Sequence, residues 1–310
     1  MPIELIKEKC AGPINTVEIG RANKRVVRIG GESAMPFLLD EGLMPNAPVV
    51  ALEILDCEPV EWPEALKVPF GSALKDPVRW AVKCVKDFGA EILCVRLQGT
   101  HPDWGSRSAD RVIPMLKSII EETGLPLIIV GGGDDDRDND ILPKVSQALK
   151  GENCLLGTAT QNNYKTLTAT ALADGHSIIA ESPIDINIAK QTNILISDMG
   201  FNPQRIVMHP TTTSLGYGME YVYSIMERGR LAAFIGDKML AMPFVLFVGS
   251  EVWNVKEARD AGRTQGINWE IATAVSMLLA GADLLVMRHP AAAKAVSRYI
   301  GLAMNGGPKK

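Results

Sequence analysis

The sequence predicts a parallel (β/α)₈ barrel of the TIM type, preceded by a β-hairpin. From residue 48 onward, eight short apolar runs alternate with longer segments of helical periodicity. The runs are almost continuously apolar, which is typical of parallel strands buried on both faces. Glycines stand shortly before five of them, where helix C-caps are expected. A doubly wound open sheet is the alternative, because a count of strands does not show that a sheet closes.

The elements follow in order along the chain. Ile14–Gly20 and Arg25–Gly31 flank a short polar turn and predict a hairpin that caps one mouth of the barrel. The eight expected strands are 49–55, 92–97, 125–130, 154–156, 177–180, 206–208, 244–248 and 283–287, and the expected helical segments include 77–88, 145–150, 164–173, 188–199, 219–233 and 268–280. No linker rich in Pro, Gly or Ser divides the chain. We therefore expect one domain over residues 1–310, with the hairpin at about 14–31 and the barrel at about 48–304.

Composition excludes several classes of protein. The chain has 310 residues with 46% hydrophobic and 22% charged residues, which argues against intrinsic disorder. Its net charge of −4 gives no electrostatic basis for nucleic-acid binding. The five cysteines form no CxxC pair and are expected to be free thiols. The N-terminus has no apolar signal core, and the most apolar stretch is too short to span a bilayer. We expect a soluble, cytoplasmic protein with no membrane or nucleic-acid partner.

The candidate site is the C-terminal mouth of the barrel, where the segments after the strands meet. Most polar residues there are hydroxyls and amides, which suit a large organic ligand that carries amide or carbonyl groups. The segment Thr211–Gly218 (TTTSLGYG) is the richest, although it could also be an ordinary strand-to-helix turn. The other polar residues at the mouth are Gln98, Thr100, His101, Thr158, Thr160, Gln161, Asn162, Asn163, Ser182, Asp185 and Asn187, together with the charged or ring-bearing Glu53, Asp56, Glu181, His209, Glu251, Trp253, Arg288 and His289.

Gly131–Gly133 and the acidic run that follows have a structural explanation. No GK[ST] follows the glycines, so they are not a P-loop, and the acids lack the spacing of an EF-hand. Acidic residues are favourable at a helix N-terminus, and we expect that role here.

No metal site or catalytic residue is predicted. His101, His209 and His289 all lie at strand ends, but no metal-binding spacing accompanies them. His176 follows Asp174-Gly175 as in a corrinoid-binding D-x-H-x-x-G signature, yet Ile179 replaces the glycine and the position precedes a strand. Carboxylate pairs could hydrolyse glycosides, but the aromatic content of 5% argues against sugar subsites.

Nine segments resemble the small (delta) subunit of the corrinoid/iron–sulfur protein of the acetyl-CoA decarbonylase/synthase (Wood–Ljungdahl) pathway. They extend from about residue 14 to residue 290 and are long enough to be far more specific than a short motif. The segments are INTVEIG, RIGGESAMPF, EILDCEPVEWPEALKVPFG, CVRLQGTHPD, GENCLLGTATQNNYKTL, SPIDINIAKQTNILI, HPTTTSLGYGMEYVYSIMERGRL, GDKMLAMPFV and LLVMRHP.

The resemblance implies a TIM barrel that forms a heterodimer with a large corrinoid/iron–sulfur subunit. The large subunit alone carries the 4Fe–4S cluster, and a cobamide of the cobalamin type lies between its corrinoid domain and the barrel mouth. A methyl group passes from methyltetrahydrofolate, through a methyltetrahydrofolate:corrinoid methyltransferase, to the cobalt and then to acetyl-CoA synthase/CO dehydrogenase. The further partner that the resemblance implies is a reductive activator. In this reading the chain itself is a non-catalytic cap.

The resemblance also implies cobamide contacts at the mouth. The residues that match are Thr211, Thr212, Thr213, Ser214, Gly216 and Tyr217, followed by Asp185, Asn187, Asn162, Thr100 and His101. The alternative is a pterin-binding methyltransferase barrel that acts directly on methyltetrahydrofolate. Asp185 and Asn187 would then contact the pterin rather than the corrin ring.

Overall fold

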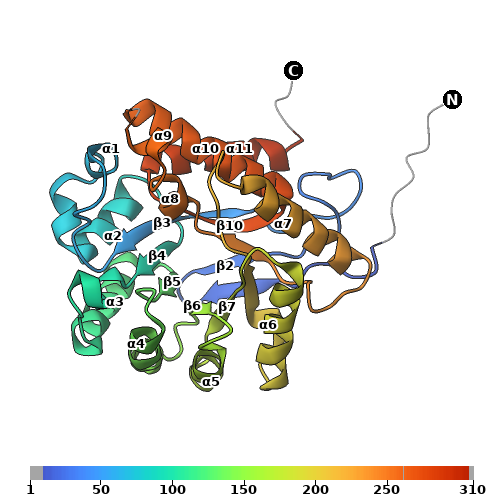
Figure 1. Cartoon of the computed structure of the whole chain (residues 1–310), viewed down its shortest axis with the longest axis horizontal. Coiled ribbons are helices and arrows are strands. Elements are labelled where there is room, and N and C mark those ends of the chain that lie inside the picture. The colour runs from blue at the N-terminus through green and yellow to red at the C-terminus, as the bar shows by residue number, and fades with distance from the viewer. Residues whose placement is uncertain (1–9, 261, 307–310) are drawn as a thin grey trace.

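A computed structural model, which describes residues 10–260 and 262–306, confirms the closed parallel barrel (Figure 1). Strand β10 pairs with β3 and closes the sheet in the order β10-β3-β4-β5-β6-β7-β8-β9. The closure excludes the open-sheet alternative. The barrel strands are β3 (Val49–Leu55), β4 (Leu93–Arg96), β5 (Leu127–Val130), β6 (Leu155–Ala159), β7 (Ser177–Glu181), β8 (Ile206–His209), β9 (Phe244–Leu246) and β10 (Ala282–Met287).

Helices surround the barrel and connect its strands (Figure 1). They are α1 (Glu64–Lys67), α2 (Pro77–Lys86), α3 (Ala109–Thr123), α4 (Asp135–Ala148), α5 (Tyr164–Asp174), α6 (Ile186–Asp198), α7 (Met219–Phe234), α8 (Val248–Val252), α9 (Lys256–Arg259), α10 (Arg263–Ala280) and α11 (Pro290–Met304). The five glycines expected before strands all have positive φ, and they are Gly89, Gly124, Gly175, Gly200 and Gly281.

Several expected boundaries differ from the structure by one to ten residues, and two of these differences are instructive. Helix α4 begins ten residues earlier than the segment 145–150, because Asp134 caps it by accepting the N–H of Arg137. The polar first turns of α4 hide its helical periodicity, and Pro143 interrupts it. Strand β9 ends at Leu246, and helix α8 begins at Val248, within the apolar run assigned to the strand.

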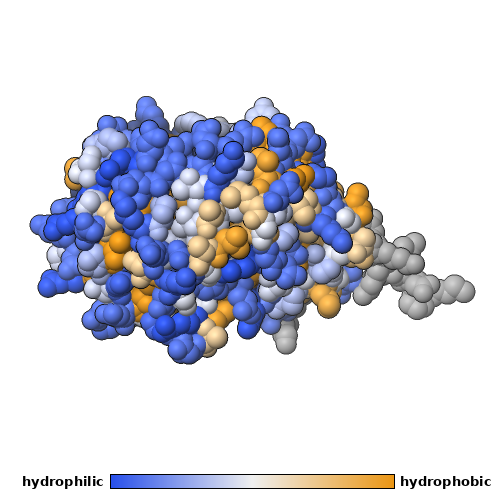
Figure 2. Space-filling model, turned by 90° about the horizontal axis from the view of Figure 1, so that it is seen from below, coloured by the Kyte–Doolittle hydropathy of each residue, from blue (hydrophilic) through white to orange (hydrophobic). Residues whose placement is uncertain are grey.

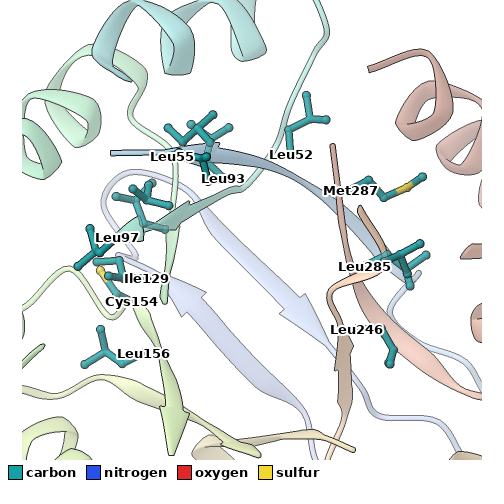
Figure 3. Close-up of a cluster of buried hydrophobic side chains, with 14 of the residues drawn as sticks. Leu52, Leu55, Leu93, Leu97, Ile129, Cys154, Leu156, Leu246, Leu285 and Met287 are labelled. Atoms are coloured by element: carbon teal, nitrogen blue, oxygen red, sulfur yellow. The ribbon is translucent and has the colours of Figure 1, made fainter. Parts of the chain in front are cut away.

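The N-terminal hairpin closes the N-terminal mouth of the barrel. Strands β1 (Val17–Gly20) and β2 (Val26–Ile29) pair antiparallel and cross the opening inside the ring of strands (Figure 3). Their apolar side chains are buried in one cluster with the inward residues of the barrel. Asn153, in the turn before β6, donates to the carbonyls of Glu18 and Gly20 and so fixes the hairpin to this end. The expectation that the hairpin caps one mouth is confirmed.

A second apolar cluster lies between the barrel and the helices. Its strand residues point outward, away from the barrel axis, as the labelled leucines in Figure 3 show. Cys154 belongs to this cluster, and all five cysteines are free. Seen from below, the outer surface is mainly hydrophilic, with hydrophobic residues in small separate patches (Figure 2).

A buried ionic cluster fastens the exit of the hairpin to the barrel. Arg230 of α7 contacts Asp283 of β10 and lies 3.8 Å from the carboxylate of Glu32, just after the hairpin. All three residues are less than 5% exposed. Burial, with a further contribution from Glu32, holds the pKa of Asp283 well above its usual value, although Arg230 opposes the shift. One guanidinium therefore serves two carboxyl groups.

We predict that Arg230→Leu lowers the free energy of unfolding by about 3–5 kcal/mol, the usual cost of leaving a buried charge without its partner. Urea denaturation of the purified chain measures the change. Arg298→Leu, at an exposed position of α11, is the matched control and should change stability by less than about 0.5 kcal/mol. Equal stability of the two variants would contradict the role of the cluster.

Candidate functional site

The interior of the barrel changes from apolar to charged along its axis. The lower layers contain residues such as Ile92, Ile128 and Leu155, packed on the hairpin. Charged and ring-bearing residues occupy the C-terminal ends of the strands. A cavity of about 360 Å³ opens above them at the C-terminal mouth, and its polar lining includes Arg96, Asp138, Thr158, Glu181, His209, Thr211, Thr212, Ser250, Glu251 and Arg288.

Glu53 forms the floor of this mouth together with two arginines. One oxygen of its fully buried carboxylate accepts from Nε of Arg96 at 2.7 Å, and the other accepts from Nε of Arg288. Burial alone would raise the pKa of Glu53, but the two guanidinium groups lower it to about 2. The carboxylate is therefore ionised throughout the physiological range and is committed to the arginines.

Both arginines are held from other directions as well. The guanidinium of Arg96 lies 5.2 Å from the ring centre of Phe247, and that of Arg288 lies 5.0 Å from the ring centre of Trp62. The backbone N–H of Arg288 donates to buried Glu270 of α10 at 2.7 Å. Burial raises the pKa of Glu270 to about 7, against the effect of its hydrogen bonds. Each arginine thus has little freedom to turn toward a ligand.

Three other titratable side chains face the cavity without such ties. His209 donates from Nδ1 to the carbonyl of Val245 at 3.1 Å in the neutral form, which burial favours by lowering the pKa of His209. Its Nε2 is then an acceptor. Glu181 and Glu251 line the same cavity, and neither forms an ion pair within 4 Å in the described part of the chain. Burial raises the pKa of Glu251.

The segment after β8 is built rigidly along one wall of the mouth. Thr211 has φ 62°, a strained value for a β-branched residue, and its hydroxyl donates to the carbonyl of Ser182 at 2.8 Å. The hydroxyl of Thr212 accepts the N–H of Phe247 at 2.9 Å. At the rim, the hydroxyl of Tyr217 donates to the carboxylate of Glu257 at 2.7 Å. These bonds fix the wall to three neighbouring segments.

Three hydroxyls beside this wall are buried and unsatisfied. They belong to Ser182, Thr213 and Ser214, and none has a hydrogen-bond partner among the described residues. Buried hydroxyls are normally bonded, because an unpaired one costs about 1–3 kcal/mol. The three hydroxyls lie in two adjacent segments, after β7 and after β8, and two further unsatisfied atoms, Oδ2 of Asp56 and Nε2 of His289, lie after β3 and β10.

The three glycines after β5 have a local partner. The carboxylate of Asp138 in α4 accepts the N–H groups of Gly132 at 2.7 Å and Gly133 at 3.0 Å. A side chain on Gly131 would come within 2.2 Å of this carboxylate. The acidic run caps and begins α4, as expected, so this loop is occupied by the protein itself.

The remaining predicted residues lie around the rim, and several are engaged locally. Asp185 caps α6 by accepting two backbone N–H groups, and Asn162 donates to Asp135 at 3.1 Å. The hydroxyl of Thr100 is buried and donates to the carbonyl of Leu97. His101 accepts a backbone N–H with Nδ1, which caps a short 3₁₀ turn. Asn187 and Gly216 are exposed. The structure thus joins Thr211 and Thr212 to the charged floor around one cavity, whereas the other predicted cobamide contacts do not line it.

The histidines at the strand ends face different surroundings. His289 caps α11 and stacks on Trp253, whereas His209 lies inside the barrel. His176 is buried at the opposite end, bonded to Cys154 and Ser146. Over residues 10–260 and 262–306, no group of three or more His, Cys, Asp or Glu is placed to hold a metal ion. Within the same ranges, every helix is too short or too polar to cross a membrane.

Comparison with known proteins shows the family to which the chain belongs. Residues 16–302 match the family described as the CO dehydrogenase/acetyl-CoA synthase delta subunit. The chain belongs to this family. The delta subunit of the acetyl-CoA decarbonylase/synthase complex from Methanopyrus kandleri is 33% identical over 285 residues, which cover 89% of this chain and 70% of the relative. That from Methanocaldococcus jannaschii is 31% identical and covers 97% and 76%.

Solved structures with the same fold are dihydropteroate synthases. The enzyme from Thermus thermophilus has a TM-score of 0.54 at 15% identity and covers 87% of this chain and 100% of its own. The enzyme from Xanthomonas albilineans has a TM-score of 0.60 at 14% identity, with coverage of 86% and 97%. At these identities the likeness shows that this delta-subunit chain shares the TIM-barrel fold.

The charged floor includes one residue that the sequence reading of this delta-family chain missed. Arg96 belongs to the run ILCVRL, whose pattern predicts only a strand. The available signal was a charge inside an apolar strand, at an inward position two residues after Cys94. Glu53, in VVALEIL, has the same pattern, and its sequence position predicts only that it lies at the mouth.

We predict that Glu53 makes stability pH-dependent. A pKa lowered from 4.5 to about 2 adds stability that is fully present above pH 5 and is lost as the pH falls. The difference in unfolding free energy between wild type and Glu53→Gln should shrink by about 2 kcal/mol between pH 6 and pH 3. Urea titrations at both pH values measure it. Glu64→Gln, at an exposed carboxylate, is the matched control, and a change for Glu53→Gln no larger than that of the control would refute the prediction.

We also predict that the backbone of Thr211 is under strain. Thr211→Gly and Thr211→Val both remove the hydroxyl, but only glycine adopts φ 62° without steric cost. The glycine variant should therefore be more stable than the valine variant by about 1 kcal/mol, despite the usual entropic cost of glycine. Thermal denaturation compares the two. A valine variant at least as stable as the glycine variant would contradict the strain.

Proposed function

We propose that the chain caps a cobamide held by a large corrinoid/iron–sulfur partner subunit, with the C-terminal mouth over the corrin ring. The observation that carries this proposal is the group of buried, unsatisfied hydroxyls of Ser182, Thr213 and Ser214, which lie in the segments after β7 and β8, next in sequence to the cavity-lining residues Glu181 and Thr212. Membership of the delta-subunit family supports a role inside a multi-subunit complex. When bound, the cobamide supplies a cobalt centre that carries the methyl group.

The donor and acceptor set at the mouth fits the edge of a corrin ring. The ring carries acetamide and propionamide arms, each with a carbonyl acceptor and N–H donors. A hydroxyl can serve either partner, since it both donates and accepts. Ser182, Thr213 and Ser214 would bond the arms, while Thr211 and Thr212 keep the wall in position through their own bonds.

The rim of the mouth is suited to a protein partner. Several large apolar side chains on the segments after strands are exposed, although such residues are usually buried. Val60 after β3 is 71% exposed, and Tyr217 after β8 is 50% exposed. Trp104, Val68 and Ile184 on neighbouring segments are exposed too. A corrinoid domain seated on this rim would cover them together with the ring.

The residues of the mouth favour a cap over a catalyst. Glu53 is locked between two arginines, which leaves Glu181, Glu251 and His209 among the titratable groups of the cavity without an ion-pair partner in the described residues. Apolar layers lie directly beneath the floor, so water can reach the covered face only from the mouth, which a seated partner would close. The cap must separate from the ring when the methyltransferase, acetyl-CoA synthase/CO dehydrogenase or the reductive activator needs access. The chain therefore protects the site and controls access to it.

Anaerobic purification tests the proposal directly. The chain would be purified alone and co-expressed with the large subunit, with corrinoid absorbance recorded during size-exclusion chromatography. We expect a colourless lone chain and a coloured one-to-one complex. A complex that forms without corrinoid under cobamide-replete growth, or a lone chain that retains it, would refute the capping role.

We predict that Thr213→Val with Ser214→Ala weakens cobamide retention by the complex about tenfold, since two hydrogen bonds to the ring edge are lost. Retention is measured as corrinoid per complex after dialysis. Thr168→Val is the matched control, because its hydroxyl is also buried and unsatisfied but lies in α5, away from the mouth. Equal losses in both variants would show a general effect on stability instead.

A second candidate function is favoured by the cavity itself. Glu181 and Glu251 face about 360 Å³ of space within the barrel and could accept the N–H groups of a pterin. The chain would then be a methyltransferase barrel. Binding of methyltetrahydrofolate by the isolated chain, measured by calorimetry and abolished by Glu181→Gln, would support this function over the cap.

A further inference from the structure

A second cavity, of about 690 Å³, opens at the opposite end of the barrel from the proposed cobamide site. One wall is the outer edge of hairpin strand β2, and the other walls are the segment 45–50 that leads into β3, the turn 88–91 before β4, and a face of α11. The floor is apolar, with Val49, Leu52, Phe88 and Ile300 among its residues. We call this cavity the hairpin groove.

The backbone groups that face the groove follow from the hydrogen bonds of β1. Gly20 donates its N–H to the carbonyl of Asn153 at 2.8 Å, and the Glu18 carbonyl accepts from the side chain of Asn153. Glu18 and Gly20 therefore direct their backbone groups away from β2. Because alternate residues of an antiparallel strand face opposite edges, Val17 and Ile19 bond their partners Ile29 and Val27.

The intervening residues of β2, Val26 and Arg28, consequently point their N–H and C=O groups into the groove. Gly30, two residues further on, confirms the direction: its carbonyl accepts from Nδ2 of Asn46, a residue of the groove wall. In residues 10–260 and 262–306, no hydrogen bond reaches the backbone groups of Val26 or Arg28. Strand β2 thus has one open edge along the groove.

We propose that the hairpin groove takes an extended segment of another subunit of the complex, which adds to β2 as a third strand. Proteins that bind a peptide by strand addition have a free strand edge beside a groove with an apolar floor. Main-chain hydrogen bonds to the edge hold the peptide, and its alternate side chains pack on the floor. The four residues of β2 span about 13 Å, enough for a segment of about four residues.

The charges of the groove indicate an acidic segment. Arg25 and Arg28 lie along the edge and pair with exposed Glu91 and Glu18. Lys294 of α11 is exposed on the facing wall, with no carboxylate within 4 Å among the described residues. An aspartate or glutamate on the incoming strand would therefore find a free cation.

The same charges argue against a second copy of this chain as the occupant. Two β2 edges paired together would bring two copies of Arg25 and Arg28 to one short ladder. Like charges on adjacent strands destabilise the pairing, and the exposed ion pairs with Glu91 and Glu18 offset this only in part, because surface ion pairs are weak. A segment from a different subunit avoids this repulsion.

Amide hydrogen exchange tests the inference. Residue-resolved mass spectrometry would compare the free chain with the complex purified with its native subunits. We expect the amides of Val26 and Arg28 to exchange at least tenfold more slowly in the complex, while Val27 and Ile29 are protected in both samples. Unchanged exchange at Val26 and Arg28 would overturn the proposal. Protection that appears in the free chain and rises with its concentration would assign a second copy and would also overturn it.

A pair of variants provides the independent test. Arg28→Pro removes the outward N–H but no bond of the β1–β2 ladder, and proline is tolerated at such strand edges. Arg28→Ala removes the same side chain and keeps the N–H. We expect Arg28→Pro to weaken assembly at least tenfold relative to Arg28→Ala, at equal urea midpoints. Equal affinities would contradict strand addition. Because the groove lies at the other end of the barrel, neither result depends on the proposed cobamide cap.

Discussion

The ion pairs of Glu53 with Arg96 and Arg288 hold together the part of the barrel on which its closure depends. Glu53 lies in β3, Arg96 lies in β4 and Arg288 directly follows β10, so the ion pairs join the first barrel strand to its neighbour and to the end of the last strand. The backbone ladder between β10 and β3 closes the ring, and the ion pairs connect the same strands through their side chains. They lie at the C-terminal ends, where the barrel changes from an apolar core to a polar mouth.

This position explains why a buried charge network is tolerated. Burying an ion is costly unless it is paired and its remaining polar atoms are bonded. Both oxygens of Glu53 have a guanidinium partner, and each guanidinium also lies over an aromatic ring. The carboxylate of Glu270 also holds Arg288 by accepting its backbone N–H. The result is a stiff floor on which the loops of the mouth are built.

The fold could be predicted almost completely from the sequence, because the strands of a parallel barrel are buried on both faces and appear as nearly continuous apolar runs. Eight apolar runs and the glycines before them mark the strands, as seen at Gly124 before β5 and Gly175 before β7. Helices were harder to identify where proline or polar residues disturb the periodicity. Pro114 within α3 and Pro143 within α4 are examples.

The site could be predicted only in outline. The segment after β8 is a candidate because of its hydroxyls, which composition alone shows. Whether a hydroxyl forms a hydrogen bond depends on residues distant in sequence. The hydroxyl of Thr212 accepts the N–H of Phe247, whereas that of Thr213 has no partner in the described residues. The role of Arg96 likewise depends on Glu53, 43 positions earlier. Such pairings arise from the closed ring and have no local sequence pattern.

The hairpin has a kinetic consequence for whatever occupies the barrel mouth. Because β1 and β2 fill the N-terminal opening with apolar side chains, the cavity inside the barrel is accessible only from the C-terminal mouth. Anything that enters between the strand ends must leave by the same route. A partner seated on the rim would then set the residence time of every molecule beneath it. The rate of exchange of these molecules would equal the rate at which the partner dissociates from the rim.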